Sequence, residues 1–544
     1  GMVISPISLD DNYGVFDKDG EPCLMMDMDE AHEVGAAKYD FLVLKTVQVI
    51  RDACRYIGKE YPKTHEINWE DEDVWNDILK SPGAIFQFES PFAFECLKKY
   101  KCKNIFDMSL VTACIRPSGT SYRDDLLARK PNHNPSEIID ELLSDNNGYL
   151  VYQEDVIKFL QHICGLSGSE ADNIRRAIGR KDKERLDKAM PQILEGYCSK
   201  SDKPREDSEN EAKTFLQILE DSASYMFGYN HSIAYCLLGY LCAYLRYYYP
   251  MEFITSFLNN AANDSDIKTG TELAKKYGIK MILPKFGYSR GEYYFNSDDK
   301  VIAKGVGSVK YISRSVSDEL YYLAQENKYE YFMDLLTDIF SKTSLDARQT
   351  EVLIKIDFFS DFGNQRELLR LFDLFKFFKK GCAKEIKKSL VESTPLEDII
   401  KRHSVGQTKS GADSRNYTSL EIVPILHECE DRLKETKMDD LDLRVRIKNF
   451  EDIMGYAGYT SGKPEDRPML FIKDIFALRR KKDGKQFGYS IITHSIGSGI
   501  ESRFTVFNRI YDKDPIKKDD IIKCTGFERD GKYFTMTSYI HLYE

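Results

Sequence analysis

The spacing of hydrophobic residues divides the sequence into a long helical part and a shorter part of β-strands. From residue 47 to residue 450, apolar side chains recur mainly three or four positions apart, which is the spacing of one face of an α-helix. From Met469 onward they alternate with polar residues in five runs, LFIKDIFAL, FGYSIITHSI, SRFTVF, DIIKCTGF and YFTMTSYIHL. Glycine-containing turns separate several of the runs, so the pattern predicts five strands that close into a small barrel.

The stretch from 152 to 181, YQEDVIKFLQHICGLSGSEADNIRRAIGRK, predicts two helices joined by a turn. The first is expected to end at Gly165. For the second, Ser169 and Asp172 suggest a capping box, and Gly179 suggests the end. The apolar positions of the two helices are Val156, Phe159, Leu160 and Ile163, and then Ile174, Ala177 and Ile178.

A dense group of cations stands at the end of the second helix: Arg175, Arg176, Arg180 and Lys181. Like charges one turn apart repel by roughly a few tenths of a kcal/mol, so an acidic neighbour or a bound anion is expected to offset them. Two interpretations are open. The group is either a phosphate-binding cluster or a solvated face, in which Asp172 pairs with Arg176 and Glu184 with Arg180.

Length and charge limit the classes of protein that the sequence can encode. A chain of 544 residues is too long for one hydrophobic core and is expected to form roughly three or four domains. The formal net charge of −11 argues against binding of nucleic acid over the whole surface, so any polyanion site must be local. No apolar run is long enough to span a membrane, and the twelve cysteines include no CxxC pair, so we expect a cytoplasmic protein with reduced thiols.

One carboxylate lies inside an apolar run near the start of the chain. Asp40 is followed by Phe41 and Leu42, in a stretch expected to be a strand. A carboxylate in such a run costs desolvation energy unless it is paired or binds a cation, so Asp40, with Lys38 nearby, is a candidate metal ligand. An aspartate at an exposed strand end is the alternative that this stretch leaves open.

Three further segments suggest contacts with nucleic acid. In VIAKGVGS (301–308) and LIKIDFFSDFGNQR (353–366), glycines precede an expected helix, and turns of this kind can point backbone N–H groups at a phosphate. In the barrel, Arg479 and Arg503 could contribute charge for binding a single strand. The aromatic residues that could stack on bases are Phe487, Tyr489, Phe504 and Phe507. Strand alternation means that about half of them must fill the barrel instead.

Taken in order, the motifs resemble the C-family of bacterial and phage replicative DNA polymerases, the DNA polymerase III alpha subunits. The motifs are KYDFL, FQFES, IRPSG, YQED, RRAIGRK, FGYNHSIAY, KGVGS and FFSDFGNQR, followed by the barrel, and the resemblance covers almost the whole chain. It implies that Asp40 binds a catalytic metal ion and that Lys38 faces the triphosphate. The residues it places around the incoming nucleotide are Arg116, Gln153, Arg175, Arg176, Lys181, Asn230, His231 and Ser232. Those it places on duplex DNA are Lys304, Gly305, Gly307, Ser308, Gly363 and Asn364.

The sequence departs from the family in its metal ligands. The family's two-metal site needs a paired Asp-x-Asp upstream of Asp40 and an N-terminal domain of the metallophosphoesterase type, and this chain is expected to begin after both. Asp27-Met28-Asp29 is the nearby Asp-x-Asp, and its position predicts an acidic helix start. No Gln-x-x-Leu-Phe peptide follows Phe372, so binding to a sliding clamp stays open.

These observations predict a multidomain, mainly α protein with a small α/β palm remnant and a C-terminal all-β barrel of the oligonucleotide-binding type. The expected division is a palm remnant (1–46), fingers (47–260), a tandem helix-hairpin-helix region that binds duplex DNA (261–378), a helical spacer or docking region (379–465) and the barrel (466–544).

The expected function is part of a DNA-directed DNA polymerase. Its substrates would be primer–template DNA and deoxynucleoside triphosphates, and its cofactor Mg²⁺ in a two-metal site to which this chain contributes one ligand. A missing or separate N-terminal polymerase chain would supply the other aspartates, and the isolated chain would be inactive. The alternative is a non-catalytic DNA-binding or replisome-docking protein derived from the polymerase. Retention of Lys38, Asp40 and the arginines favours the polymerase over the non-catalytic protein.

Overall fold

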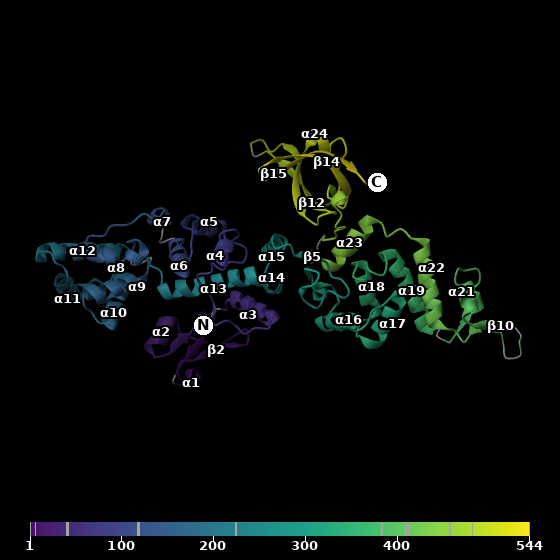
Figure 1. Ribbon diagram of the computed structural model, residues 1–544, viewed down its shortest axis with the longest axis horizontal. Helices are drawn as coiled ribbons and strands as arrows, with labels where there is room; N and C mark the ends of the chain where they lie inside the picture. Colours follow the sequence, from purple (N-terminus) through teal and green to yellow (C-terminus); the bar gives the residue numbers. More distant parts are fainter. Residues whose placement is uncertain are drawn as a thin grey trace. The chain divides into compact units, whose positions relative to one another are not determined.

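The computed structural model describes residues 2–542 apart from 6, 40–42, 117–119, 223–225, 382–383, 408–410, 412, 456–457, 481 and 532. The chain forms two compact units, Gly1–Leu273 and Ala274–Glu544, and Figure 1 shows their elements. The finer division expected from the sequence stays a prediction. No helix among the described residues is long and apolar enough to cross a membrane.

The first unit opens with two small antiparallel sheets. Strand β1 (Met2–Ile4) pairs with β4 (Ala37–Tyr39), and β2 (Val15–Lys18) pairs with β3 (Glu21–Leu24), while α1 (Leu9–Tyr13) and α2 (Met28–Glu33) lie between them in sequence. The Asp27 carboxylate accepts the N–H of Glu30 at 3.0 Å, and the Glu30 carboxylate accepts the N–H of Asp27 at 2.9 Å. Asp27 therefore caps α2, which confirms the predicted helix start.

The rest of the first unit is helical. Helix α13 (Tyr229–Tyr248) is its long central element and contacts α3 (Lys45–Ile57), α4 (Glu72–Ile78), α6 (Ile105–Cys114) and α14 (Pro250–Asn259) (Figure 1). Tyr240 on α13 is fully buried, with its ring 5.3 Å from Trp69 and 5.0 Å from Trp75. The other helices are α5 (Pro91–Tyr100), α7 (Arg123–Leu127), α8 (Glu137–Leu142), α9 (Gln153–Lys158), α10 (Gly168–Arg180), α11 (Lys183–Lys200), α12 (Arg205–Ser222) and α15 (Asp264–Lys276).

Helix α10 has its predicted apolar face but different ends. Helix α9 continues as a π-helical turn (Phe159–Ile163), and all seven predicted apolar positions of the two helices are buried. The cap of α10 is Ser167, which forms a capping box with Glu170, so the predicted cap at Ser169 is wrong. The helix runs past Gly179 to Arg180 and ends where Lys181 adopts a left-handed conformation with φ 57°. Only residues 201–204 separate α11 from α12.

The helical part of the second unit follows a three-stranded sheet. In this sheet β7 (Val301–Ala303) lies between β5 (Lys280–Ile282) and β6 (Tyr294–Asn296). The helices are α16 (Arg314–Glu326), α17 (Phe332–Lys342), α18 (Ala347–Lys355), α19 (Gln365–Gly381), α20 (Lys388–Val391), α21 (Glu397–Arg402), α22 (Ile422–Thr436) and α23 (Leu443–Met454). The region expected to be a helical spacer also contains a sheet in which β10 (Asp413–Thr418) lies between β8 (Glu385–Lys387) and β9 (Val405–Gln407).

The predicted five-stranded barrel is confirmed. Its strands are β11 (Met469–Arg479), β12 (Gln486–Ser495), β13 (Glu501–Phe507), β14 (Ile521–Asp530) and β15 (Tyr533–His541). They close in the order β11-β12-β13-β15-β14, with β13 parallel to β15 and the other pairs antiparallel. Alternate residues such as Ile491, Phe504, Val506 and Met536 fill the interior, as the period of two requires.

Candidate functional site

Segments that lie far apart in the sequence converge on the side chain of Phe227. The Arg116 guanidinium lies over its ring, 4.9 Å from the centroid, and the ring of His231 is 5.3 Å away. The backbone N–H of Gln153 donates to the carbonyl of Phe227 at 3.0 Å, and the N–H of Phe227 donates to the carbonyl of Val151 at 3.3 Å. Three of the predicted site residues therefore meet at Phe227, two at its ring and one at its backbone carbonyl.

Hydrogen bonds to neighbouring segments hold this arrangement in place. Arg116 Nη2 donates to Gln87 Oε1 at 2.8 Å, which ties the turn after α6 to the FQFES segment. Arg123 donates to the carbonyls of Cys114 and Arg116 at 2.7 and 2.8 Å, and so fixes the chain where α6 ends. Residues 117–119, the rest of the IRPSG motif, lie outside the described residues. These hydrogen bonds fix the side chain and the backbone of Arg116, so its planar guanidinium needs little reorganisation to bind an anion.

Gln153 connects the ring to the cations of α10. Its Nε2 donates to the carbonyl of Met226 at 3.1 Å, and its Oε1 accepts from Arg175 Nη1 at 3.0 Å. We define the Phe227 cluster as Gln87, Arg116, Gln153, Arg175, Phe227 and His231. The cluster joins five of the motifs that carried the resemblance.

A single carboxylate serves two of the arginines on α10. Asp172 accepts from Arg175 Nε and from Arg176 Nε, each at 2.9 Å. The hydrogen bond from Arg175 lowers the pKa of Asp172 below its ordinary value, and the bond from Arg176 adds to the effect. The predicted pair of Asp172 with Arg176 is therefore present, and one positive charge of the two arginines stays uncompensated.

The remaining cations of this stretch face solvent. Arg180 and Lys181 are exposed, and within the described part of the chain neither forms an ion pair. Glu184 pairs with Lys188 at 2.6 Å, so its predicted pairing with Arg180 is wrong. Glu184 and Lys188 are one turn apart on α11, which is the spacing that favours such a pair.

The first turn of α13 divides its three predicted residues. His231 and Asn230 are exposed, and the His231 ring contacts that of Tyr235 at 4.1 Å. Ser232 is fully buried, where it donates to the carbonyl of Ser109 at 3.0 Å and accepts from the Ser109 hydroxyl at 2.9 Å. His231 and Asn230 can therefore reach a ligand at the surface, whereas Ser232 joins α13 to α6.

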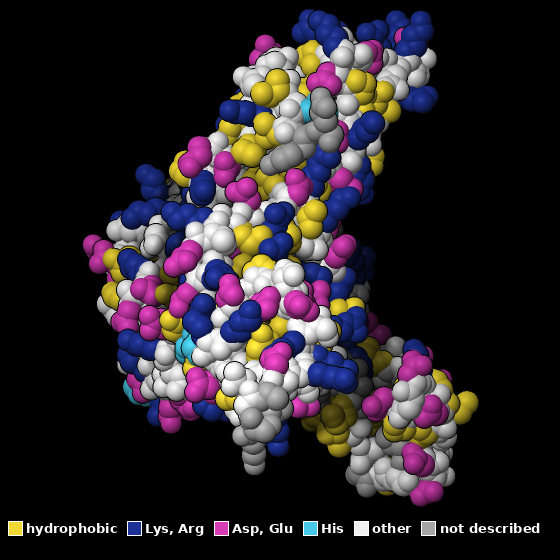
Figure 2. All heavy atoms as spheres, turned by 90° about the vertical axis from the view of Figure 1, so that its right-hand side faces the viewer, with side chains coloured by type: hydrophobic (Ala, Val, Ile, Leu, Met, Phe, Trp, Pro, Cys, Tyr) yellow, Lys and Arg dark blue, Asp and Glu magenta, His cyan; other side chains and the backbone are white. Residues whose placement is uncertain are grey.

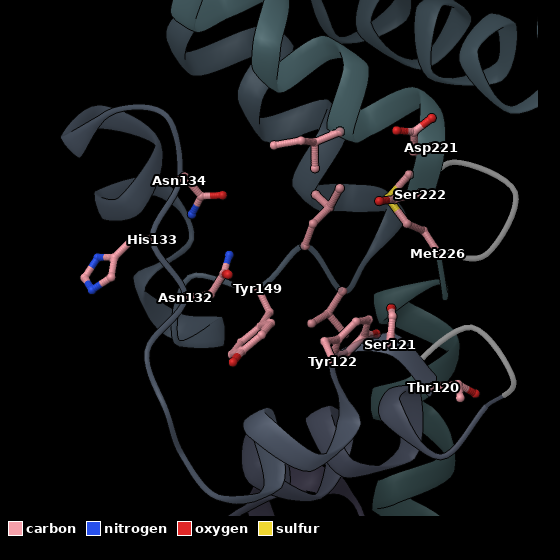
Figure 3. A pocket seen from close by; sticks show the side chains of 13 residues that line it. Thr120, Ser121, Tyr122, Asn132, His133, Asn134, Tyr149, Asp221, Ser222 and Met226 are labelled. Carbon is pink, nitrogen blue, oxygen red and sulfur yellow. The ribbon is translucent and has the colours of Figure 1, made fainter.

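A cavity of about 710 Å³ adjoins the Phe227 cluster through Met226, which contributes to its wall. Figure 3 shows its lining, which comes from residues 120–122, 132–134 and 149–151 and from the end of α12. Tyr122 and Tyr149 lie with their rings 5.6 Å apart, and the ring of His133 points away from the other side chains (Figure 3). The lining includes the carboxylate of Asp221 but neither lysine nor arginine, so it suits an uncharged polar group better than a phosphate.

The comparisons with known proteins agree with the position of this cluster. The sequence model described as "Bacterial DNA polymerase III alpha subunit finger domain" matches residues 46–201, which include Arg116, Gln153 and Arg175. The curated DNA polymerase III subunit alpha of Campylobacter jejuni is 31% identical over 500 residues, which are 88% of this chain and 38% of that protein. The chain belongs to the family of the bacterial DNA polymerase III alpha subunit.

Two further alpha subunits show how much of the family protein is represented. That of Treponema pallidum is 27% identical over 479 residues, which are 86% of this chain and 38% of that protein. That of Bacillus subtilis is 28% identical over 351 residues, which are 63% of this chain and 31% of that protein. The chain thus spans about two fifths or less of the length of these alpha subunits.

The metal site expected of a DNA polymerase III alpha relative is not assembled by the described residues. Asp40, the predicted ligand, lies outside them. Lys38 is exposed on β4, where it pairs in register with Val3 of β1. Among the residues that the structure describes, no three of the His, Cys, Asp and Glu side chains come together in a way that could hold a metal ion. Asp40 is not one of these residues, so Mg²⁺ binding stays a prediction.

The glycines of the 304–308 turn serve close packing. The N–H groups of Val306 and Gly307 donate to the carbonyls of Arg290 and Gly291 at 2.8 and 3.0 Å. A Cβ atom on Gly307 would lie 2.6 Å from the Gly291 carbonyl oxygen, and one on Gly305 would lie 2.5 Å from the backbone of Glu292. The expectation that these N–H groups point outward is wrong for 306 and 307. Burial lowers the pKa of Lys304 to about 8, and the side chain of Ser308 lies outside the described residues.

The second glycine motif forms a helix cap. Asn364 Oδ1 accepts the N–H of Glu367 at 3.0 Å, and the Glu367 carboxylate accepts the N–H of Asn364 at 3.0 Å. The Asn364 amide also donates to the carbonyl of Met438 at 2.8 Å. Gly363 has a φ of 156°, and a Cβ atom there would lie 2.9 Å from the carboxylate of Glu367. The polar groups of Asn364 are therefore used within the second unit.

The predicted barrel residues fall on different sides of the strands. Arg479 and Arg503 are exposed, and Lys and Arg side chains gather at the top of the view in Figure 2. Phe487 is half-buried, 6.3 Å from the ring of Phe507, which is 37% exposed. Tyr489 stacks on Tyr511 at 3.7 Å and packs against the barrel core, so its ring is occupied within the protein.

Two members of the Phe227 cluster were missed as site residues. Gln87 is a polar residue in an apolar run, and this is a signal that the sequence contains. Phe227 begins the FGYNHSIAY motif, but an aromatic residue beside a helix start gives no sign that an arginine will stack on it. The contact with Arg116 joins positions more than one hundred residues apart and needs the tertiary structure.

Proposed function

We propose that the chain is part of a DNA-directed DNA polymerase, which adds deoxynucleotides to a primer 3′ end, and that the Phe227 cluster faces the incoming triphosphate. The observation that carries the proposal is the convergence of four family motifs on Phe227 of a fifth. The residues that these four contribute, Gln87, Arg116, Gln153 and Arg175, all lie in the stretch that the finger-domain model matches. Fingers residues of this kind would bind the nucleotide and would orient it, while a palm segment would carry out the transfer.

Charge and hydrogen bonding suit the cluster to this role. Arg116 and Arg175 offer planar guanidinium groups, which match the oxygen atoms of a triphosphate in a bidentate way. Gln153 holds Arg175 at 3.0 Å and is itself held by the carbonyl of Met226. Lys181 and Arg176 stand exposed near the end of α10 and would add positive charge as the phosphates approach.

A metal ion enters the proposal only as an expectation from the family. In such a polymerase two Mg²⁺ ions would polarise the primer hydroxyl and stabilise the leaving pyrophosphate. We propose that Asp40 contributes to that site together with aspartates of a further palm segment, in the same polypeptide or in a separate chain.

The second unit is proposed to bind the DNA. Helices α16 to α19 would form the tandem helix-hairpin-helix region on the duplex. The closed barrel, in which the five strands follow the order 1-2-3-5-4, would be an oligonucleotide-binding fold, and its exposed Arg479 and Arg503 would contact a single strand. Binding to a sliding clamp is not part of the proposal.

Nucleotide binding by the chain tests the proposal. A fluorescent deoxynucleoside triphosphate is titrated into the wild-type chain, into Arg116→Met and into Arg175→Met. Each loss of a charge-assisted contact is expected to cost about 1.5–3 kcal/mol, which is about tenfold or more in Kd. Arg185→Met is the matched control, because Arg185 is an exposed arginine on α11 that pairs with Asp182 at 3.2 Å and does not belong to the Phe227 cluster.

The same variants distinguish the enzyme part from a DNA-binding protein. If the wild-type chain binds primer–template DNA but no triphosphate, the chain is a non-catalytic binder and the proposal fails. If Arg116→Met and Arg175→Met lose triphosphate affinity while DNA affinity stays within twofold, the cluster is the nucleotide site. Equal losses in the Arg185→Met control would refute the assignment.

A further inference from the structure

A second group of cations lines a groove at the other end of α6. The groove has a volume of about 720 Å³ and lies where α5 ends, α6 begins and the chain leaves α7. Its charged lining consists of Lys99, Lys101, Lys103 and Arg129, with Asp107 as the acidic residue. We call it the α5–α6 groove. None of its residues belongs to the Phe227 cluster.

Alternation of buried and charged residues places three lysines on the open side of this groove. In the segment K-Y-K-C-K, Tyr100 is 2% exposed and Cys102 is fully buried, while the lysines on either side of them are exposed. Lys101 ends α5 in a left-handed conformation with φ 57°, and its N–H donates to the carbonyl of Leu97 at 3.1 Å. The two buried anchors therefore fix the backbone, and the three ammonium groups project from one short segment.

Arg129 completes the lining from the opposite wall. Its guanidinium lies 4.0 Å above the ring of Tyr100, and its Nη2 donates to the Tyr100 carbonyl at 3.3 Å. Nη2 also pairs with Asp107 at 3.3 Å, yet the side chain stays 49% exposed. An arginine held flat on an aromatic ring keeps its other N–H groups directed at solvent, so little side-chain freedom is lost when an anion binds.

The positive charge of the groove is only partly compensated within the protein. The Asp107 carboxylate also accepts the N–H of Lys103 at 3.0 Å, so it is shared between the backbone and Arg129. Lys99 pairs with Asp124 at 3.2 Å, but the Asp124 side chain is 91% exposed and such a pair exchanges readily with solvent. Within the described part of the chain, Lys101 and Lys103 form no ion pair.

Size and position point to an extended polyanion. The groove takes cations from two segments of chain, and its volume exceeds the need of one phosphate group. Helix α6 has ten residues and ends two residues before Arg116, so the groove and the Phe227 cluster are separated by one helix of about 15 Å. At 3.4 Å of rise per stacked nucleotide, that distance corresponds to about four nucleotides.

We propose that the α5–α6 groove binds consecutive phosphates of a nucleic-acid strand that also reaches the Phe227 cluster. The proposal rests on the polymerase function proposed above, and it names a contact to the strand that neither the barrel nor the helices of the second unit supply. Lys101 and Lys103 make direct contacts to phosphate oxygens, and Arg129 provides a fixed fork on the opposite wall.

The salt dependence of DNA binding tests the groove. The affinity of the chain for a fluorescein-labelled oligo-dT is measured by anisotropy at several NaCl concentrations, for wild type and for the double variant Lys101→Asn, Lys103→Gln. Asparagine tolerates the left-handed backbone at 101, so the fold is kept. For single strands, loss of two phosphate contacts is expected to lower the magnitude of the log K against log [salt] slope by about 1.4. The matched control, Lys200→Gln with Lys213→Gln, removes two exposed lysines of α11 and α12 and is expected to leave the slope unchanged.

Two outcomes would overturn the proposal. One is a slope for the Lys101→Asn, Lys103→Gln variant that equals that of wild type. The other is calorimetric binding of tripolyphosphate that the double variant abolishes while its DNA slope is unchanged, because the groove would then take a free oligophosphate and no strand. The triphosphate affinity of Arg116→Met is measured separately, so a failure of the proposed function shows there and a failure of the groove shows in the slope.

Discussion

Replacing Arg246 tests how much the helical core of the first unit, which positions the Phe227 cluster, depends on one buried side chain. Arg246 lies on α13, is fully buried and donates five hydrogen bonds. Two reach the Asp77 carboxylate at 2.9 and 2.6 Å, one the Asp77 carbonyl at 3.1 Å, and two the carbonyls of Ser81 and Gly83 at 3.1 and 2.6 Å. The hydrogen bonds of Arg246 thus hold α4 and the loop that leads to Gln87 against α13.

The size of the effect follows from what the substitution leaves behind. In Arg246→Met the Asp77 carboxylate, which is 5% exposed, and three carbonyls each lose the hydrogen bonds that Arg246 donates. Breaking a buried ion pair on one side costs about 3–5 kcal/mol. The double variant Arg246→Met, Asp77→Leu removes the uncompensated charge, so it is expected to recover part of this loss.

Urea unfolding followed by tryptophan fluorescence measures this effect selectively. The sequence has two tryptophans, Trp69 and Trp75, and both pack on Tyr240 of α13. The signal therefore reports the helical core of the first unit. We expect Arg246→Met to lose about 3–5 kcal/mol of unfolding free energy and to weaken triphosphate binding. A loss below about 1 kcal/mol, or a double variant less stable than the single one, would refute the reasoning.

Three further predictions follow from buried groups and close contacts. Burial raises the pKa of Asp155 to about 6, so Asp155 stays protonated in the folded protein at pH values where the unfolded chain, with a pKa near 3.9, has released the proton. The unfolding free energy of the first unit should therefore fall by roughly 3 kcal/mol as the pH rises from 4 to 6. Asp155→Asn, whose amide oxygen can replace the Oδ2 acceptor, should abolish that fall in urea unfolding at the two pH values. Burial lowers the pKa of Lys304 to about 8, so the folded protein releases this proton at a lower pH than the unfolded chain does. The stability of the second unit should therefore rise from pH 8 to 10. Lys304→Met should remove that rise in thermal unfolding, and a rise that persists in the variant would contradict the assignment. Gly307→Ala should lower the unfolding free energy by about 1–3 kcal/mol, because its Cβ would lie 2.6 Å from the Gly291 carbonyl oxygen. In Gly179→Ala on α10 the new Cβ meets no atom within 4 Å, so this variant should be more stable by about 0.5–1 kcal/mol. Equal effects of the two variants in urea unfolding would contradict the packing.

The barrel could be predicted from the sequence because the alternation of apolar and polar residues directly indicates which side chains point inward. All five predicted runs became strands, and Phe504 and Val506 fill the interior as their positions require. The sheet around β10 could not be predicted in this way. Its sequence, DSRNYT, has only Tyr417 buried, so pairing with β8 and β9 rather than an apolar pattern holds it as a strand.

Helix ends and turns show a second limit of sequence reasoning. Ser167 caps α10 and Ser169 lies in its first turn. The choice between them depends on Glu170, whose longer side chain reaches back to the cap while Asp172 binds two arginines. The glycines at 305 and 307 were correctly placed in a turn. The N–H groups of Val306 and Gly307 donate to the carbonyls of Arg290 and Gly291, which are neighbours that only the tertiary structure reveals.

For the candidate site, the sequence identified the cations but not what holds them. Arg116, Gln153, Arg175 and His231 were all expected at the site, and they meet around Phe227. The ring itself was missed, because its role is to be a surface over which the Arg116 guanidinium lies. Asp40, the expected metal ligand, lies outside the described residues.

Photo-crosslinking tests the central claim most directly. An azido-substituted deoxyadenosine triphosphate is bound to the chain with primer–template DNA, irradiated, and the modified peptides are identified by mass spectrometry. The account predicts crosslinks in the peptides that contain Arg116, Gln153, Phe227 and His231, suppressed by an excess of unlabelled deoxyadenosine triphosphate. Crosslinks confined to other peptides, with these three segments unmodified, would show that the Phe227 cluster does not bind the nucleotide.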